Sequence, residues 1–119
     1  LVARLASHGN IAGMKESGKQ PERHAPLLAK GLPGFVLLSG NASTFARALR
    51  IGYRGGILAL ADVDPELCCA LYKAVADNRP VLADELQSRL LRLDACLDPS
   101  DNFSPRLLRI LRRSSPADS

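Results

Sequence analysis

The first half of the chain contains three short apolar segments, at residues 10–15, 35–39 and 56–60. The second and third are nearly continuous apolar runs, which are typical of strands buried on both faces in a parallel sheet covered by helices. A segment with helical spacing follows each of the three apolar segments, and the helical pattern is weak after the first, at residues 21–30. Strand and helix in this repeated order predict an α/β fold built from βαβ units.

The helix after the second apolar segment carries signals at both of its ends. Asn41 or Ser43 is placed to cap a helix over residues 44–50, and Gly52 is placed to end it. This pattern predicts one short helix between the second and third strands.

Two further helices are predicted after the third strand. Asp64 is an N-cap acid, Pro65 takes the first helical position and Glu66 adds a carboxylate where the helix dipole favours one. Apolar residues then recur at helical spacing: Leu67, Leu71, Ala74 and Val75. A last helix is expected over residues 80–93, with one apolar side made of Leu82, Leu86, Leu90 and Leu93.

The composition is that of a folded globular protein. The 119 residues are 46% apolar and 24% charged, which provides for a core and argues against disorder over most of the chain. No run approaches the roughly 20 apolar residues that span a bilayer, and the first residues do not read as a signal peptide. We therefore expect a cytoplasmic protein, or one of an organellar matrix, without membrane contact.

Positive charge is concentrated near the end of the chain. The net charge of +4 equals the charge of the four arginines at residues 105–113, namely Arg106, Arg109, Arg112 and Arg113. Such a cluster can mark a nucleic-acid-binding module. Aromatic residues make up only 4% of the chain, however, and no binding motif accompanies the arginines. A solvated helix face is favoured, no nucleic-acid partner is expected, and a basic binding module is the weaker alternative.

The cysteines do not indicate a metal site. Cys68 and Cys69 are adjacent, so on a helix their side chains point about 100° apart and cannot chelate one ion, and Cys96 stands alone. A small, odd number of cysteines favours a reducing compartment and use as small core residues. We expect neither a metal nor another cofactor.

Lys15 ends the first predicted strand, where the loops of α/β barrels carry catalytic groups. Alternation puts Ile11, Gly13 and Lys15 on one face of that strand and Ala12 and Met14 on the other. A lysine buried in a barrel mouth is desolvated, and its neutral amine can attack a carbonyl. Taken alone, a strand-end lysine is more often a surface residue.

Two histidines, His8 and His24, lie in loop-like surroundings. The sequence indicates no partner for either of them, so both are expected to be ordinary surface residues.

Three motifs in register resemble a known family. The segment Asn-Ile-Ala-Gly-Met-Lys-Glu-Ser-Gly at residues 10–18 resembles the lysine strand of the dihydrodipicolinate synthase and N-acetylneuraminate lyase superfamily of class I aldolases. Residues 35–41 resemble its next strand, and residues 52–63 resemble its last barrel strand. The resemblance extends over roughly residues 1–93, and it is closest to the 4-hydroxy-2-oxoglutarate aldolase branch.

The resemblance assigns roles to four residues. Lys15 matches the lysine that forms a Schiff base with the keto group of pyruvate or a pyruvoyl substrate. Ser17 matches a substrate-binding loop position beside that lysine, and Gly40 and Ile57 match positions that line the pyruvate pocket. Neither Tyr53 nor Tyr72 matches the tyrosine that shuttles protons in this family.

The resemblance also implies a fold and a division of the chain. A complete barrel of this type takes about 250 residues, so we expect a partial (β/α)8 TIM barrel followed by C-terminal helices. Residues 1–63 would hold strands 6 to 8, residues 64–97 the helices, and residues 98–119 a divergent Arg-rich tail. Asp62 departs from the asparagine usual in the last strand, and Lys19 from an acidic or polar residue.

Two classes of function follow from these expectations. The first is a Schiff-base lyase or aldolase acting on a 2-keto acid such as pyruvate, either like 4-hydroxy-2-oxoglutarate aldolase or like dihydrodipicolinate synthase. The second is a catalytically inactive, truncated remnant of such an enzyme. Full-length members of the family are commonly homo-oligomers.

Overall fold

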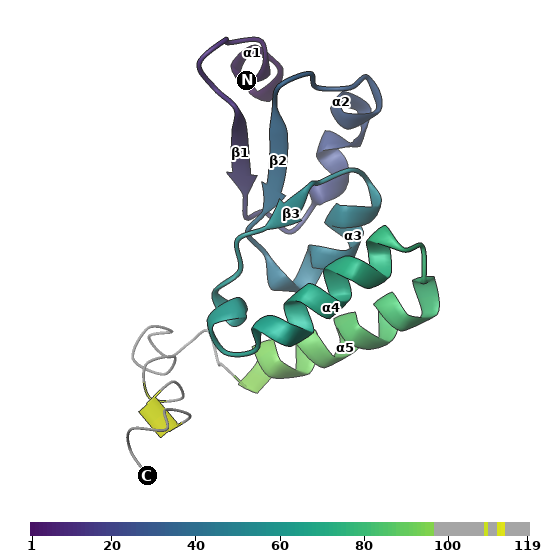
Figure 1. Cartoon of the computed structure of the whole chain (residues 1–119). Coiled ribbons are helices and arrows are strands. Elements are labelled where there is room, and N and C mark those ends of the chain that lie inside the picture. Colours follow the sequence, from purple (N-terminus) through teal and green to yellow (C-terminus); the bar gives the residue numbers. More distant parts are fainter. Residues whose placement is uncertain (97–108, 110–111, 114–119) are drawn as a thin grey trace.

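A three-stranded parallel sheet organises the first half of the molecule. The computed structural model describes residues 1–96 together with Arg109, Arg112 and Arg113. In it, β1 (Gly13–Glu16), β2 (Val36–Ser39) and β3 (Gly55–Gly56) lie side by side in chain order, all parallel (Figure 1). The predicted α/β class, with a parallel sheet and a helical segment after each strand, is confirmed.

Helical segments cover one face of this sheet, and no segment that the structure describes covers the other (Figure 1). Helix α1 precedes the sheet, η1 and α2 connect β1 to β2, and η2 and α3 connect β2 to β3. The single turn η3 then leads into the long hairpin of α4 and α5, which packs against α3. The bounds are α1 (Val2–Ala6), η1 (Pro21–His24), α2 (Ala25–Ala29), η2 (Ala42–Thr44), α3 (Phe45–Arg50), η3 (Ala59–Asp62), α4 (Pro65–Ala76) and α5 (Pro80–Cys96).

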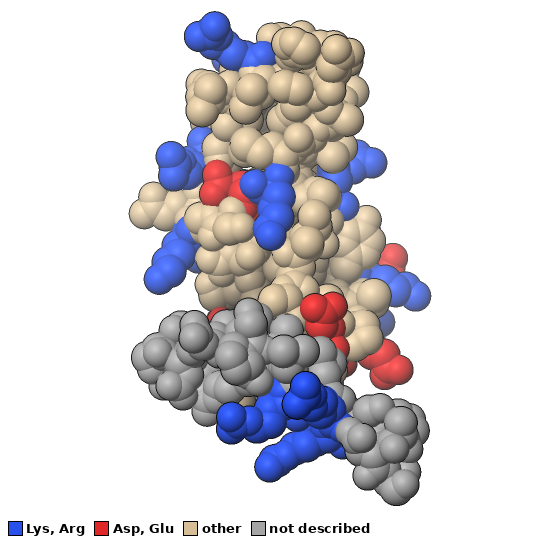
Figure 2. Space-filling view, turned by 90° about the vertical axis from the view of Figure 1, so that its left-hand side faces the viewer, with Lys and Arg blue, Asp and Glu red and all other residues tan. Residues whose placement is uncertain are grey.

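The two faces of the sheet differ in burial. On β2, Leu37 and Ser39 point toward the helices and are 0% and 1% exposed, whereas Val36 on the opposite side is 38% exposed. Leu38, which alternates with Leu37, is only half-buried. We call the uncovered side, with Gly13, Lys15, Val36, Leu38 and Gly55 in its rows, the open face. Figure 2, which views the molecule from the left-hand side of Figure 1, shows a mainly uncharged upper part with scattered basic and acidic groups.

The predicted helix signals act as expected. The Asp64 side chain accepts a hydrogen bond from the Leu67 amide at 3.0 Å and so caps α4. Gly52 has φ +114, a conformation that favours glycine, and it directly follows the C-cap of α3. Of the two candidate caps, Asn41 caps η2 and not α3: its side chain accepts from the Ser43 amide, whereas Thr44, the N-cap of α3, makes no side-chain cap bond.

Strand lengths differ from the prediction because β2 limits the sheet. Residues 10–12 and 57–60 were expected to be strand, but β1 starts at Gly13 and β3 is two residues long. β2 follows Gly34, whose φ of +72 belongs to a turn, and the chain after Ser39 turns into η2. β1 and β3 therefore have ladder partners only beside residues 36–39.

Helix α1 was not predicted, because residues 1–9 carry no cap and only a short apolar pattern. The expected helix at residues 21–30 is two short pieces, η1 and α2, with Pro26 near the start of the second. The predicted helix of the Arg-rich segment lies largely outside the described residues.

The cysteines only partly match their predicted use in the core. Cys68 is buried between α4 and its neighbours, and this burial raises the pKa of its thiol. Cys69 and Cys96 are exposed, because each lies on the solvent side of its helix. The expectation of core packing is correct for Cys68 and wrong for the other two.

Leu71→Ala is expected to lower the free energy of unfolding by about 2–5 kcal/mol. Leu71 is fully buried in the cluster that joins α3, α4 and α5, so truncation leaves a cavity. Urea unfolding measures the change, with Val81→Ala as the control because Val81 is 81% exposed on α5. Equal losses in both variants would contradict this assignment of the core.

Candidate active site

Lys15 lies at the carboxyl end of β1 on the open face. It pairs in register with Leu38, and the alternation of the strand separates it from Met14 and Glu16, which point the other way. The register supports the predicted shared face of Gly13 and Lys15, whereas Ile11 lies outside β1 and packs against the buried cluster that contains Leu37. The expected burial is not found: Lys15 is exposed, because no described segment covers this side of the sheet.

Gly40 lies directly against the lysine side chain. A Cβ built on Gly40 would lie 2.5 Å from Lys15 Cε and in still closer contact with Ser17 Oγ. Real Cβ atoms do not approach other atoms so closely, so the three groups can meet only because residue 40 is glycine. The structure thus brings together Lys15, Ser17 and Gly40, which the sequence had singled out separately.

Ile57 extends this arrangement from the third strand. Its amide donates to the Ser39 carbonyl at 2.8 Å, which continues the ladder one residue beyond β3. Alternation from Gly55 places its side chain on the open face, where it is 54% exposed. All four predicted site residues therefore lie at the carboxyl edge of the sheet, on the side of Lys15.

Asn41 holds the two loops of the site together. Its Nδ2 donates to the Ser17 carbonyl at 3.1 Å, and its Oδ1 accepts from the Ser43 amide at 3.0 Å and the Ser43 hydroxyl at 2.6 Å. The cap signal of Asn41 was visible in the sequence. Its bond to the loop after β1 was not, because the two residues are far apart in the chain.

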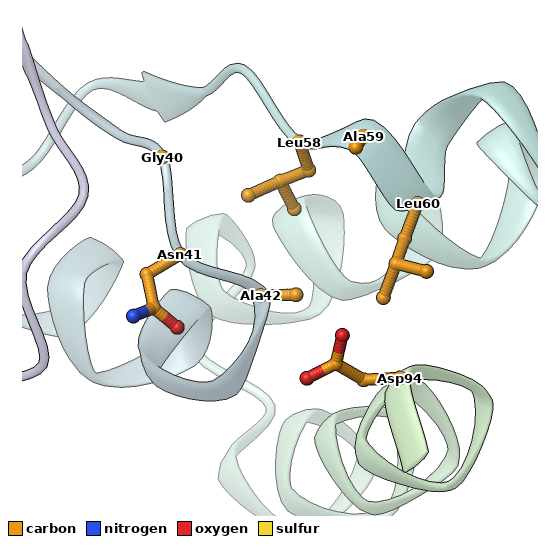
Figure 3. A pocket seen from close by; sticks show the side chains of 7 residues that line it. All are labelled: Gly40, Asn41, Ala42, Leu58, Ala59, Leu60 and Asp94. Atoms are coloured by element: carbon orange, nitrogen blue, oxygen red, sulfur yellow. The ribbon is translucent and has the colours of Figure 1, made fainter. Parts of the chain in front are cut away.

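A pocket of about 190 Å³ opens beside Gly40. It lies where the loops after β2 and β3 meet the end of α5, and its lining residues are Gly40, Asn41, Ala42, Leu58, Ala59, Leu60 and Asp94. Figure 3 shows the Asp94 carboxylate turned toward Ala42 and Leu60, while the Asn41 amide turns away from it. Among these seven lining residues Asp94 is the charged one, and Asn41 is the other polar one.

A second polar cluster lies on the opposite, helix-covered side of β1. Glu16 Oε1 accepts from the Gly18 amide at 2.6 Å, and Glu16 Oε2 lies 3.2 Å from His24 Nε2. The ring centroid of His24 is 6.5 Å from that of Tyr53, whose buried hydroxyl has no hydrogen-bond partner among the described residues. The prediction that His24 is a surface residue is wrong, since it is 9% exposed and paired with Glu16.

His8 matches its prediction more closely. It is exposed, and its Nδ1 accepts only from the nearby Asn10 amide.

The environment shifts the pKa values of two of these groups in opposite directions. The amide of Gly18, and then the hydrogen bond and charge of His24, lower the pKa of the Glu16 carboxyl. Burial, and then the negative charge of Glu16, raise the pKa of the Tyr53 hydroxyl. The carboxylate form of Glu16 and the neutral form of Tyr53 are thus favoured together.

The stability contributed by Glu16 is expected to be lost in acid. Its pKa is lowered from the ordinary value of 4.5, so the ionised carboxylate stabilises the fold fully above that value and loses its effect as pH falls through the lowered pKa. The difference in urea midpoint between the native chain and Glu16→Gln should therefore shrink below about pH 4.5. Glu85→Gln is the control because Glu85 is exposed on α5 and takes part in none of the ion pairs found among the described residues; an undiminished Glu16 difference in acid would contradict the assignment.

Two other features of the described chain bear on function. No group of three or more His, Cys, Asp or Glu side chains in residues 1–96 is arranged to hold a metal ion. None of the helices in that part of the chain is long and apolar enough to cross a membrane.

The parallel sheet, with Lys15 near the end of its first strand, is characteristic of a class of protein. Comparison with known proteins identifies that class. The model of the dihydrodipicolinate synthetase family matches residues 1–108, so the chain belongs to that family. A 4-hydroxy-tetrahydrodipicolinate synthase from Xanthomonas axonopodis pv. citri is 34% identical over 102 residues, which cover 86% of this chain and 32% of that protein. One from Stenotrophomonas maltophilia is 45% identical over 64 residues, or 54% of this chain and 22% of that protein.

Solved structures agree with this assignment. A Thermus thermophilus protein described as a dihydrodipicolinate synthase superposes with a TM-score of 0.73 at 38% identity, over 81% of this chain and 34% of that one. YagE of E. coli K12, solved in complex with pyruvate, has the same fold with a TM-score of 0.74 at 23% identity, over 88% of this chain and 36% of that one. The chain spans about a third of the length of the relatives named here, except the Stenotrophomonas enzyme, of which it covers less.

Proposed function

We propose that this chain supplies the Schiff-base lysine of a lyase that acts on pyruvate or a pyruvoyl 2-keto acid. The observation that carries the proposal is the placement of Lys15 at the carboxyl end of a parallel strand, with the Gly40 backbone and the Ser17 hydroxyl against its side chain. Such an edge is where barrels of this kind carry their chemistry.

The chemistry follows from an amine and a keto group. The neutral Lys15 amine adds to the keto carbon, and loss of water gives an iminium that draws electrons from the neighbouring carbon. When a carbon–carbon bond to that neighbouring carbon breaks, the resulting enamine takes up a proton there, and hydrolysis restores the amine and releases pyruvate. When such a bond forms instead, hydrolysis releases the enlarged keto acid. Ser17 and the Gly40 backbone would hold the keto acid, and Ile57 would provide an apolar wall.

We further propose that β1, β2 and β3 are strands 6 to 8 of a (β/α)8 barrel, with residues 1–63 forming the barrel part and residues 64–97 the following helices. Both β1 and β3 have one hydrogen-bonded neighbour, and the open face lacks a cover among the described residues. Neighbouring strands would pair with both edges and enclose Lys15, which would supply the desolvation that a Schiff-base amine needs. The complete enzyme would be a cytoplasmic homo-oligomer.

Two branches of the family compete for the reaction. The residues around Lys15 favour a 4-hydroxy-2-oxoglutarate aldolase-like lyase, whereas several relatives are named 4-hydroxy-tetrahydrodipicolinate synthase and favour a synthase. The other candidate is an inactive remnant. The positions of the two tyrosines favour the remnant, because neither provides a proton-shuttling tyrosine next to Lys15. Tyr53 is buried with His24 behind the sheet, and Tyr72 lies on α4.

Reductive trapping tests the proposal. The folded chain is incubated with pyruvate and borohydride, and peptide masses locate the adduct. A pyruvate-derived mass on Lys15 supports the Schiff-base function, and its absence supports the remnant.

A second assay separates the branches. Cleavage of 4-hydroxy-2-oxoglutarate between C3 and C4 releases pyruvate and glyoxylate, which favours the aldolase. An adduct formed without this cleavage favours the synthase branch.

A further inference from the structure

We propose that Glu16 is a positioning residue for the lysine site: by binding Gly18 and His24 it holds the loop that places Ser17 against Lys15. This inference deepens the proposed function of Lys15 and rests on it. It gives a role to the residue next to the lysine, although the Glu16 side chain lies on the opposite face of the strand.

Glu16 does not act as the counter-ion of Lys15. Successive residues of a strand point to opposite faces, so Lys15 lies on the open face in register with Leu38 while Glu16 is in register with the buried Ser39. Both carboxylate oxygens of Glu16 are engaged on the helix-covered side, one by Gly18 and one by His24. Any influence of Glu16 on Lys15 must therefore pass through the loop.

The loop after β1 closes tightly around the carboxylate. The Gly18 amide lies 2.6 Å from Glu16 Oε1, and a Cβ on residue 18 would lie 2.7 Å from the same oxygen. Only glycine allows this approach without displacing the carboxylate. The hydrogen bond joins residues on either side of Ser17, so it restricts the position of the Ser17 backbone. Asn41 restricts it from a third direction by donating to the Ser17 carbonyl at 3.1 Å.

The other carboxylate oxygen ties this loop to the helical layer. His24 ends η1, is almost fully buried and lies against the Tyr53 ring. η1 is in turn joined to α3 by the exposed pair of Glu22 Oε1 and Arg47 Nε at 2.6 Å. Glu16 thus connects the Ser17 loop to a buried side chain of the scaffold. A hydroxyl on a loop needs such support to stay beside a reacting amine.

The experiment compares Glu16→Ala with Glu85→Ala in the full chain, each of which removes one negative charge. Glu85 is exposed on α5 and takes part in none of the ion pairs found among the described residues. We measure the rate of pyruvate adduct formation at Lys15 across pyruvate concentrations, and the hydrogen exchange of the Gly18 amide. Glu16→Ala should expose the Gly18 amide to exchange and raise the half-saturating pyruvate concentration about tenfold, with a smaller change in the maximal rate. Glu85→Ala should change neither quantity.

A conservative variant separates positioning from simple structural support. Glu16→Gln retains the oxygen that accepts from Gly18, and it should restore both exchange protection and the half-saturating concentration to near their native values. If Glu16→Ala does not fold, Glu16→Asp keeps the charge but withdraws the carboxylate by one methylene, and it should show the same concentration shift.

The outcomes that overturn the proposal are distinct. An unchanged half-saturating concentration in a folded Glu16→Ala or Glu16→Asp chain that has lost Gly18 protection would show that the site does not depend on the loop. An equal shift in Glu85→Ala would assign the effect to net charge. No adduct in the native chain, with Gly18 still protected from exchange, would remove the proposed function and this inference with it.

Discussion

Lys15→Ala is expected to abolish the pyruvate-derived adduct completely, while the fold is retained. Lys15 is exposed on the open face and takes part in none of the ion pairs found among the described residues. Its removal should therefore change the free energy of unfolding by no more than about 0.5 kcal/mol. Intact mass after borohydride reduction measures the adduct, and circular dichroism checks the fold.

Two variants complete this test. Lys15→Arg keeps the positive charge, but its guanidinium stays protonated and cannot form the imine, so it should be as inactive as Lys15→Ala. Lys19→Ala removes an exposed lysine from the loop that follows β1 and should form the adduct normally. An adduct that survives in Lys15→Ala, or that is lost in Lys19→Ala, would assign the chemistry to another lysine.

Gly40→Ala is expected to reduce the rate of adduct formation by about 100-fold, because a displacement of about 1 Å at a reacting group costs that much. The new methyl group would lie 2.5 Å from Lys15 Cε and would also overlap the Ser17 hydroxyl. Both atoms are near the ends of side chains, so they can move aside at little cost to the fold. The expected result is therefore a chain of nearly native stability with a displaced lysine.

Gly55→Ala is the matched control for this variant. Gly55 lies on the same open face, in register with Leu38, but a Cβ there would meet its nearest neighbour, Leu38 Cδ2, at an ordinary 3.6 Å. It should leave adduct formation within a few-fold of the native rate. Similar losses in the two alanine variants would contradict the specific role of Gly40.

Local signals were sufficient to predict most helices and the order of the strands. Asp64 caps α4 as its sequence predicts, and Leu86 and Leu90 of the predicted apolar side of α5 are buried. These signals act between residues only a few positions apart, so they can be recognised in a single sequence. The same locality explains why strand ends were predicted less well: they depend on where the neighbouring strand begins and ends.

Contacts between distant segments could not be predicted. His24 has no acid in its immediate sequence that pairs with it, and its partner Glu16 comes from the preceding strand. Gln87 on α5 accepts from the Ala46 amide at 2.8 Å and donates to the Ala42 carbonyl at 2.9 Å, and so caps a helix on which it does not lie. The site residues Lys15, Gly40 and Ile57 were found through a resemblance to a family, and periodicity alone would not have joined them.

The order of the strands has a consequence for how this piece can be combined with others. Each strand pairs only with the strand next to it in the chain, and the helical layer lies on one side. Strand–helix units can therefore be added at either edge without breaking any hydrogen bond of the existing sheet. In the proposed barrel, complementary units on a separate polypeptide would therefore pair with these edges through backbone hydrogen bonds, and the strand that carries Lys15 would keep its present partner β2.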